Sequence, residues 1–100
     1  MDQTAPQAVH VVVRGRVQGV GFRMFIASHA RKLGLNGTVR NLADGSLEAW
    51  ACGPRSALER LVEEIEAGPH LAHVESCAVA WESPGRAWAG FAIVGGTYEC

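Results

Sequence analysis

The order of two apolar patterns constrains the fold of this chain more than any other feature. Residues 22–33 and 54–67 place apolar side chains at helical spacing, and each run is followed by a glycine that can end a helix. Runs that are rich in valine or alternate in polarity predict strands instead, over residues 9–14, 37–42, 47–52, 74–81 and 91–94. The resulting order, βαββαβ with a short extra strand, predicts an α+β sandwich in which two helices cover one face of an antiparallel sheet.

Size and composition predict one ordered domain. The chain has 100 residues, of which 48% are apolar, so an intrinsically disordered chain is not expected. We expect the domain over residues 8–94, between flexible tails at residues 1–7 and 95–100. No apolar run approaches the roughly 20 residues of a membrane span, and the N-terminus lacks the pattern of a signal peptide.

The cysteines indicate the compartment. The chain has three of them, Cys52, Cys77 and Cys100. An odd count without paired spacing favours free thiols and a cytoplasmic protein, and leaves a Cys52–Cys77 disulfide as the alternative.

A glycine-rich stretch, GRVQGVGFR over residues 15–23, joins the first predicted strand to the first predicted helix. Glycine adopts backbone angles that other residues avoid, so such a loop can turn several amide N–H groups toward one point. The helix that follows adds unpaired N–H groups and a partial positive charge. A cation such as Arg23 is unfavourable in the first turn of a helix unless an anion lies between its guanidinium and the helix start. The stretch therefore predicts a cradle for a phosphate or carboxylate, with Arg16 either assisting or solvated.

The glycine spacing matches neither the P-loop nor the dinucleotide fingerprint. A simple alternative is a glycine-rich turn that only lets a strand meet a helix closely. Charge favours the anion site, since residues 3–43 contain no acid but hold Arg14, Arg16, Arg23, Arg31, Lys32 and Arg40. The uneven distribution of charge would also arise if the basic first half and the acidic second half of a small domain simply neutralised one another. The positive region coincides with the predicted cradle, however, which favours an anion site.

Asn41 is the second candidate, and the predicted topology selects it. The first two strands should run parallel with the third between them, so their carboxyl ends share one sheet edge, where the glycine-rich stretch begins. Alternation places Asn41 on the face of Val39, which is the helix-covered side if Val39 is in the core. Asn41 can then meet Arg23 over one anion and hold a water through its amide. A turn role, common for asparagine at a strand end, is the alternative.

These residues resemble two signatures of one family. GRVQGVGFR at residues 15–23 and GTVRNLADGSLE at residues 37–48 resemble the first and second motifs of acylphosphatases, and the likeness extends over most of the chain. The resemblance implies a ferredoxin-like fold and hydrolysis of acyl phosphates to a carboxylate and inorganic phosphate, without a metal or other cofactor. It also implies that Arg23 is the phosphate-binding catalytic arginine and that Asn41 positions the attacking water. The cradle would then be formed by the backbone amides of Gly15, Arg16, Val17, Gln18, Gly19, Val20, Gly21 and Phe22.

Other functions are weaker predictions. Similar domains occur inside larger carbamoyl-transfer proteins, so a module that binds phosphate or carbamoyl phosphate without turnover stays open. RNA-recognition domains share the βαββαβ order, but they stack bases on strand aromatics, and the central strands here offer only Trp50. His70, His73 and Cys77 have a generic spacing without placed carboxylates, so no metal site is expected. We therefore expect a monomer that binds a small acyl phosphate, with inorganic phosphate as product or inhibitor, and neither nucleic acid nor a membrane.

Overall fold

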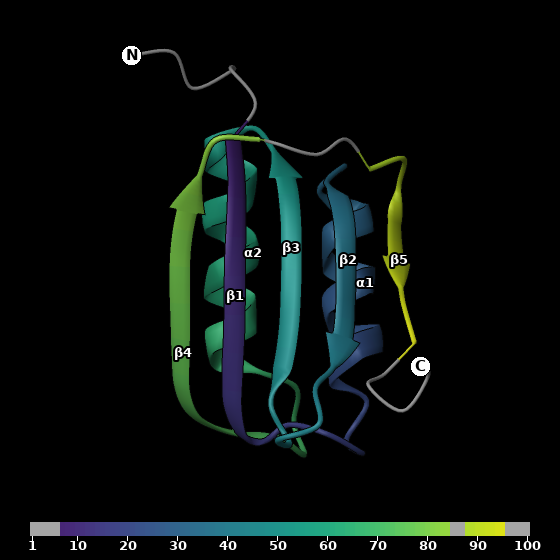
Figure 1. Ribbon diagram of the computed structural model, residues 1–100, viewed down its shortest axis with the longest axis vertical. Coiled ribbons are helices and arrows are strands. Elements are labelled where there is room, and N and C mark those ends of the chain that lie inside the picture. The colour runs from purple at the N-terminus through teal and green to yellow at the C-terminus, as the bar shows by residue number, and fades with distance from the viewer. Residues whose placement is uncertain (1–6, 85–87, 96–100) are drawn as a thin grey trace.

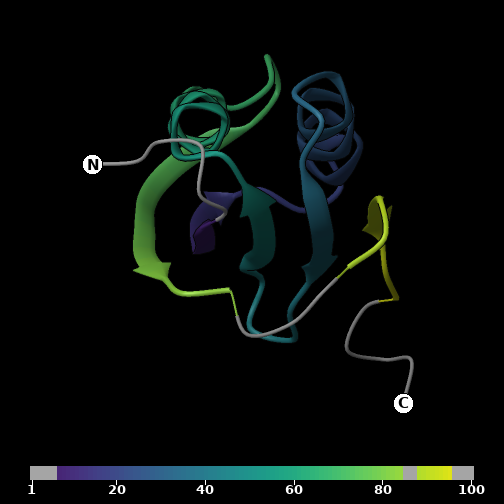
Figure 2. The ribbon, with the colours of Figure 1, turned by 90° about the horizontal axis from the view of Figure 1, so that it is seen from above.

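The computed structural model describes residues 7–84 and 88–95, which form one sheet with both helices on the same face (Figures 1 and 2). The predicted sandwich is confirmed, and element ends lie within two residues of those expected. In chain order the elements are β1 (Gln7–Arg16), α1 (Phe22–Lys32), β2 (Asn36–Asn41), β3 (Leu47–Gly53), α2 (Arg55–Ala67), β4 (His73–Glu82) and β5 (Phe91–Ile93). Gln7, predicted as the last residue of the N-terminal tail, already belongs to β1, whereas residues 1–6 and 96–100 of the predicted tails lie outside the described residues.

The strand order is β4-β1-β3-β2-β5. As predicted, β3 lies between β1 and β2 and pairs antiparallel with both, so β1 and β2 run parallel and end at one edge. The fifth strand departs from the prediction, because β5 pairs parallel with β2 and makes the sheet mixed. The direction of the last two strands explains this pairing. Strand β4 runs antiparallel to β1, and β5, at the other edge of the sheet, runs opposite to β4 and so in the same direction as β2 (Figure 1).

The core lies between the sheet and the helices. Every second residue of β1 from Val9 to Val13 is fully buried, and Val39 of β2 is buried on the same side. The helices contribute one apolar stripe each, with Phe22, Ile26, Ala27 and Ala30 from α1 and Leu58, Leu61, Val62 and Ile65 from α2. Burial of each valine, leucine, isoleucine or phenylalanine side chain among these is worth about 1.5–3 kcal/mol. Because Phe22 anchors the start of α1 in this core, the residues that follow it in the first turn are held at the sheet edge.

The first strand is longer than its apolar run predicts. Gly15 and Arg16 pair with Val74 and His73 of β4, after a register shift between Arg14 and Gly15 that marks a β-bulge. A Cβ on Gly15 would lie 2.1 Å from the backbone oxygen of His73, so only glycine fits this close approach. The first two residues of the predicted cradle therefore belong to the sheet, and the loop itself begins at Val17.

Cys52 and Cys77 are free thiols, so the disulfide alternative is excluded, while Cys100 lies outside the described residues. Burial, with a smaller contribution from the charge of Glu66, raises the pKa of the Cys77 thiol to about 11. Among the described residues, no helix is long and apolar enough to cross a lipid bilayer.

Candidate active site

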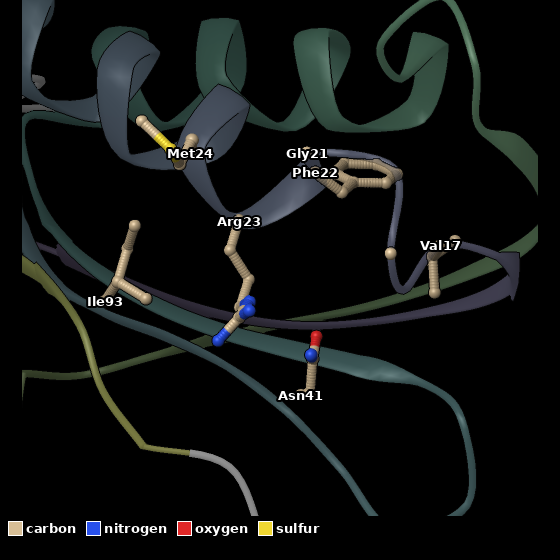
Figure 3. Close-up of a pocket in the computed structure, with 8 residues that line it drawn as sticks. Val17, Gly21, Phe22, Arg23, Met24, Asn41 and Ile93 are labelled. Carbon is tan, nitrogen blue, oxygen red and sulfur yellow. The ribbon is translucent and has the colours of Figure 1, made fainter.

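A cavity of about 350 Å³ opens where the glycine-rich loop, the start of α1 and the end of β2 meet (Figure 3). Its walls come from segments that are distant in sequence but adjacent at one sheet edge. The lining residues are Val17, Gly19, Gly21, Phe22, Arg23, Met24, Asn41 and Ile93. The predicted convergence of Arg23 and Asn41 at one site is therefore what the structure contains.

The start of α1 is built without a side-chain cap. Gly21 occupies the N-cap position with φ 78° and ψ 15°, a left-handed conformation that a side chain would strain, and it provides no side-chain capping hydrogen bond. The first turn contains no acidic residue. The unpaired N–H groups of this turn and the positive end of the helix dipole are thus available to an anion in the cavity.

Arg23 is the second residue of α1, half-buried, and its guanidinium extends toward the end of β2 (Figure 3). Within residues 7–84 and 88–95 it has no hydrogen-bond or ion-pair partner, in contrast to Arg14, Arg40 and Arg55, each of which faces a carboxylate. A guanidinium presents donors in a fork that fits two phosphate oxygens. A cation that no described residue pairs with, beside a helix start without a side-chain cap, makes this cavity strongly attractive to a phosphate.

Asn41 is the last residue of β2 and projects toward the same space as Arg23 (Figure 3). Its side-chain oxygen Oδ1 is buried and has no hydrogen-bond partner among the described residues. Leaving such an acceptor unpaired costs about 1–3 kcal/mol, so buried polar atoms nearly always have a partner. The orphan oxygen indicates that a water or a ligand group completes the site.

Only some of the predicted cradle residues line this cavity. The predicted residues that line the cavity are Val17, Gly19, Gly21 and Phe22, whereas Val20 is half-buried against the core. Gly15 lies instead beside a second, smaller cavity with Asp44 and Ser46, and Arg16 is exposed. Gln18 does not line the main cavity, and its side chain bonds to the turn between β2 and β3.

Two apolar residues at the cavity were not predicted as site residues. Met24 is 71% exposed and Ile93 is 38% exposed, and both line the cavity beside Arg23. The exposure of Met24 could have been inferred, since it follows Arg23 on the polar side of a helix whose core stripe begins at Phe22. The place of Ile93 could not, because no local pattern indicates that β5 pairs with β2.

The helix-free side of the sheet carries a separate polar group. Glu48 Oε2 lies 2.8 Å from His10 Nε2, and Glu48 Oε1 accepts a 2.7 Å hydrogen bond from Arg40 Nε. Burial alone would raise the pKa of Glu48, but these hydrogen bonds outweigh it and hold the pKa below its ordinary value. Trp50 stacks on His10 with ring centroids 4.1 Å apart, so it packs against another side chain of this face.

Over the described ranges, no three His, Cys, Asp or Glu side chains are grouped so as to hold a metal ion.

Comparisons with known proteins agree with the geometry. The family model for acylphosphatase matches residues 9–93. An acylphosphatase from Salinibacter ruber is 43% identical over 93 residues, covering 93% of this chain and 98% of the relative. The crystal structure of acylphosphatase from Bacillus subtilis superposes with a TM-score of 0.85 at 38% identity, covering 88% of this chain and 98% of that one. A full-length HypF structure in a phosphate- and nucleotide-bound form also matches, with a TM-score of 0.85 and 31% identity, over 92% of this chain but 12% of HypF. The chain therefore belongs to the acylphosphatase family.

Proposed function

We propose that this protein hydrolyses acyl phosphates to a carboxylate and inorganic phosphate, in the cavity at the start of α1. The phosphoryl oxygens bind to the guanidinium of Arg23 and to backbone N–H groups of the loop and the first helical turn. Residues 17–22 form the inner part of this cradle, while Gly15 and Arg16 support its start through their pairing with β4. Fixed donors of this kind stabilise charge that develops on the phosphoryl group in the transition state.

Asn41 holds the attacking water, and its orphan oxygen is the observation that carries the proposal. Buried Oδ1 lacks a hydrogen-bond partner among the described residues and faces the space that Arg23 also enters. A water there donates one hydrogen bond to Oδ1 and keeps a lone pair directed at the phosphorus. Holding the two reactants in this alignment removes much of the entropic cost of their encounter.

The reaction needs little acid or base help. The water oxygen attacks phosphorus, the bond from phosphorus to the acyl oxygen breaks, and its electron pair leaves with the carboxylate. The conjugate acid of that leaving group has a pKa of about 4, by analogy with Asp and Glu, so it departs unprotonated. Arg23 is the only ionisable residue among those that line the described cavity, so we assign the water's proton to a phosphoryl oxygen of the substrate.

The acyl substituent lies against Met24 and Ile93, since both apolar side chains flank the cavity beside Arg23. We further propose that the protein acts as a cytoplasmic monomer on a small-molecule substrate, with inorganic phosphate as product and competitive inhibitor.

Hydrolysis of benzoyl phosphate, followed by loss of its ultraviolet absorbance, tests the proposal. We expect turnover by the wild type and a loss of about 3 kcal/mol of transition-state stabilisation, roughly a hundredfold or more in kcat/KM, for Arg23→Ala. Arg60→Ala is the matched control, because it removes an arginine that lies on α2, pairs with Glu64 and does not line the cavity, so it should change kcat/KM little. A folded wild type without activity, or wild-type kinetics for Arg23→Ala, would reject the proposal.

A binding module for phosphate or carbamoyl phosphate is the second candidate. It is favoured by one observation, the match of this chain to 12% of the much longer HypF. Titration calorimetry with inorganic phosphate, beside the hydrolysis assay, separates the two. Tight binding with negligible turnover would favour the module, whereas turnover with weaker product binding favours the enzyme.

A further inference from the structure

Gln18 makes the side-chain contacts that join the two halves of the candidate site. Its Nε2 donates one hydrogen bond of 2.8 Å to the backbone oxygen of Leu42 and another of 2.8 Å to that of Ser46. The side chain is half-buried, and it links the phosphate loop to the turn between β2 and β3. Among the described residues, no other side-chain hydrogen bond joins the loop over residues 17–21 to this turn.

The acceptors of Gln18 belong to a turn that is itself well defined. The N–H of Leu42 donates to the Ser46 oxygen at 2.9 Å, so Gln18 bonds at the base of a closed turn. Within the turn, the Asp44 carboxylate accepts hydrogen bonds from both the N–H and the hydroxyl of Ser46. Gln18 is therefore tied to a rigid structure rather than to a loose loop.

The position of these bonds along the chain matters most. Leu42 directly follows Asn41, while Gln18 directly precedes Gly19, which lines the cavity. A primary amide nitrogen carries two hydrogens, and here each is directed to one carbonyl oxygen. The two bonds thus fix the separation between the segment that carries the cradle N–H groups and the residue that faces them from β2.

We propose that Gln18 is a positioning residue, whose side chain sets the distance between the phosphate cradle and Asn41 without itself touching the substrate. This inference rests on the proposed function. Reactivity depends steeply on alignment, because a misplacement of about 1 Å can cost about a hundredfold in rate. Loss of the two bonds should therefore reduce kcat through Asn41 while leaving the phosphate donors in place.

Gln18→Leu tests the inference, with Gln7→Leu as its control. Gln7 lies at the opposite end of β1 and accepts one hydrogen bond, of 3.1 Å, from Arg55 Nη1, so its substitution removes a side-chain contact of similar size away from the cavity. We expect kcat on benzoyl phosphate to fall about tenfold or more for Gln18→Leu, while the inhibition constant of inorganic phosphate changes less than about threefold. Gln7→Leu should leave both constants unchanged, and urea denaturation of each variant confirms that the assays report folded protein.

A double-mutant cycle and a pH profile separate positioning from a general structural effect. If Gln18 acts through Asn41, Gln18→Leu should have little further effect on kcat in an Asn41→Ala background. Gln18→Glu keeps the shape of the side chain but places a carboxylate against the two backbone carbonyl oxygens, which cannot donate to it. In acid the carboxyl group is protonated and can again donate a hydrogen bond, so the activity of this variant relative to wild type should rise as the pH falls.

Three results would overturn the inference while leaving the proposed function intact: wild-type kcat for Gln18→Leu, an undiminished effect of Gln18→Leu in the Asn41→Ala background, or a flat pH ratio for Gln18→Glu. A wild type that fails to hydrolyse benzoyl phosphate would reject the proposed function itself.

Discussion

Replacing Gly15 with alanine tests whether the first glycine of the signature belongs to the sheet. The added Cβ would lie 2.1 Å from the His73 oxygen and 2.8 Å from the Glu75 nitrogen, both in the backbone of β4. These atoms cannot retreat without opening the pairing of β1 with β4. Overpacking costs about 1–3 kcal/mol, and a φ of +130° adds about 1–3 kcal/mol of backbone strain. We expect a loss of about 3–5 kcal/mol, a large part of the roughly 5–15 kcal/mol that stabilises a typical domain.

Gly34→Ala is the matched control for that measurement. Gly34 follows α1 with a φ of +72°, and a Cβ there would meet nothing within 4 Å, so only backbone strain of about 1–2 kcal/mol is expected. Urea denaturation of both variants measures the difference in the free energy of unfolding. Equal losses for the two variants, or a loss below about 1 kcal/mol for Gly15→Ala, would refute the steric argument.

Three further predictions concern other parts of the molecule. Although burial opposes them, hydrogen bonds with His10 and Arg40 hold the pKa of Glu48 below its ordinary value of 4.5. The unfolded chain therefore binds more protons in acid than the folded protein, and the free energy of unfolding should fall as the pH drops below 4.5. Urea denaturation should show a less steep fall for Glu48→Gln. Because burial raises the pKa of Cys77 to about 11, its thiol should react slowly with iodoacetamide at neutral pH and faster only as the pH approaches that value, which mass spectrometry can follow; rapid labelling at neutral pH would contradict its burial. Met24→Ser should lower kcat/KM for benzoyl phosphate roughly threefold relative to acetyl phosphate, since about 30 Å² of apolar contact at about 25 cal/mol per Å² is worth about 0.75 kcal/mol; an unchanged ratio would remove Met24 from the acyl site.

The sequence predicted those features that short-range patterns control. Valine-rich runs and helical spacing marked every element, because burial of one face dictates both periods. The meeting of Arg23 and Asn41 followed from topology and strand alternation, since strands that run parallel around a third must end at one edge and Asn41 shares a face with Val39. No measured contact was needed for either inference.

The remaining features depend on contacts between distant segments. Gly15 is required because a side chain would clash with the backbone of His73 in β4, whereas Gly21 is required for the backbone conformation at the start of α1. The sequence alone does not distinguish these two reasons for a glycine, so both residues are predicted as parts of one loop. The parallel pairing of β5, which brings Ile93 to the cavity, depends on a crossing from the far edge of the sheet. The sequence also does not predict the side-chain contacts of Gln18, because their acceptors are backbone oxygens, which every residue carries.

The separation of turnover from phosphate binding in Asn41→Ala tests the account most directly. If Asn41 aligns the water while Arg23 and the backbone hold the phosphoryl group, kcat on benzoyl phosphate should fall about ten- to a hundredfold. The inhibition constant of inorganic phosphate should stay within about threefold of wild type, whereas Arg23→Ala should lose both turnover and phosphate binding. Unchanged turnover in Asn41→Ala, or a loss of phosphate affinity as large as the loss of kcat, would contradict the assignment of water to Asn41 and phosphate to Arg23.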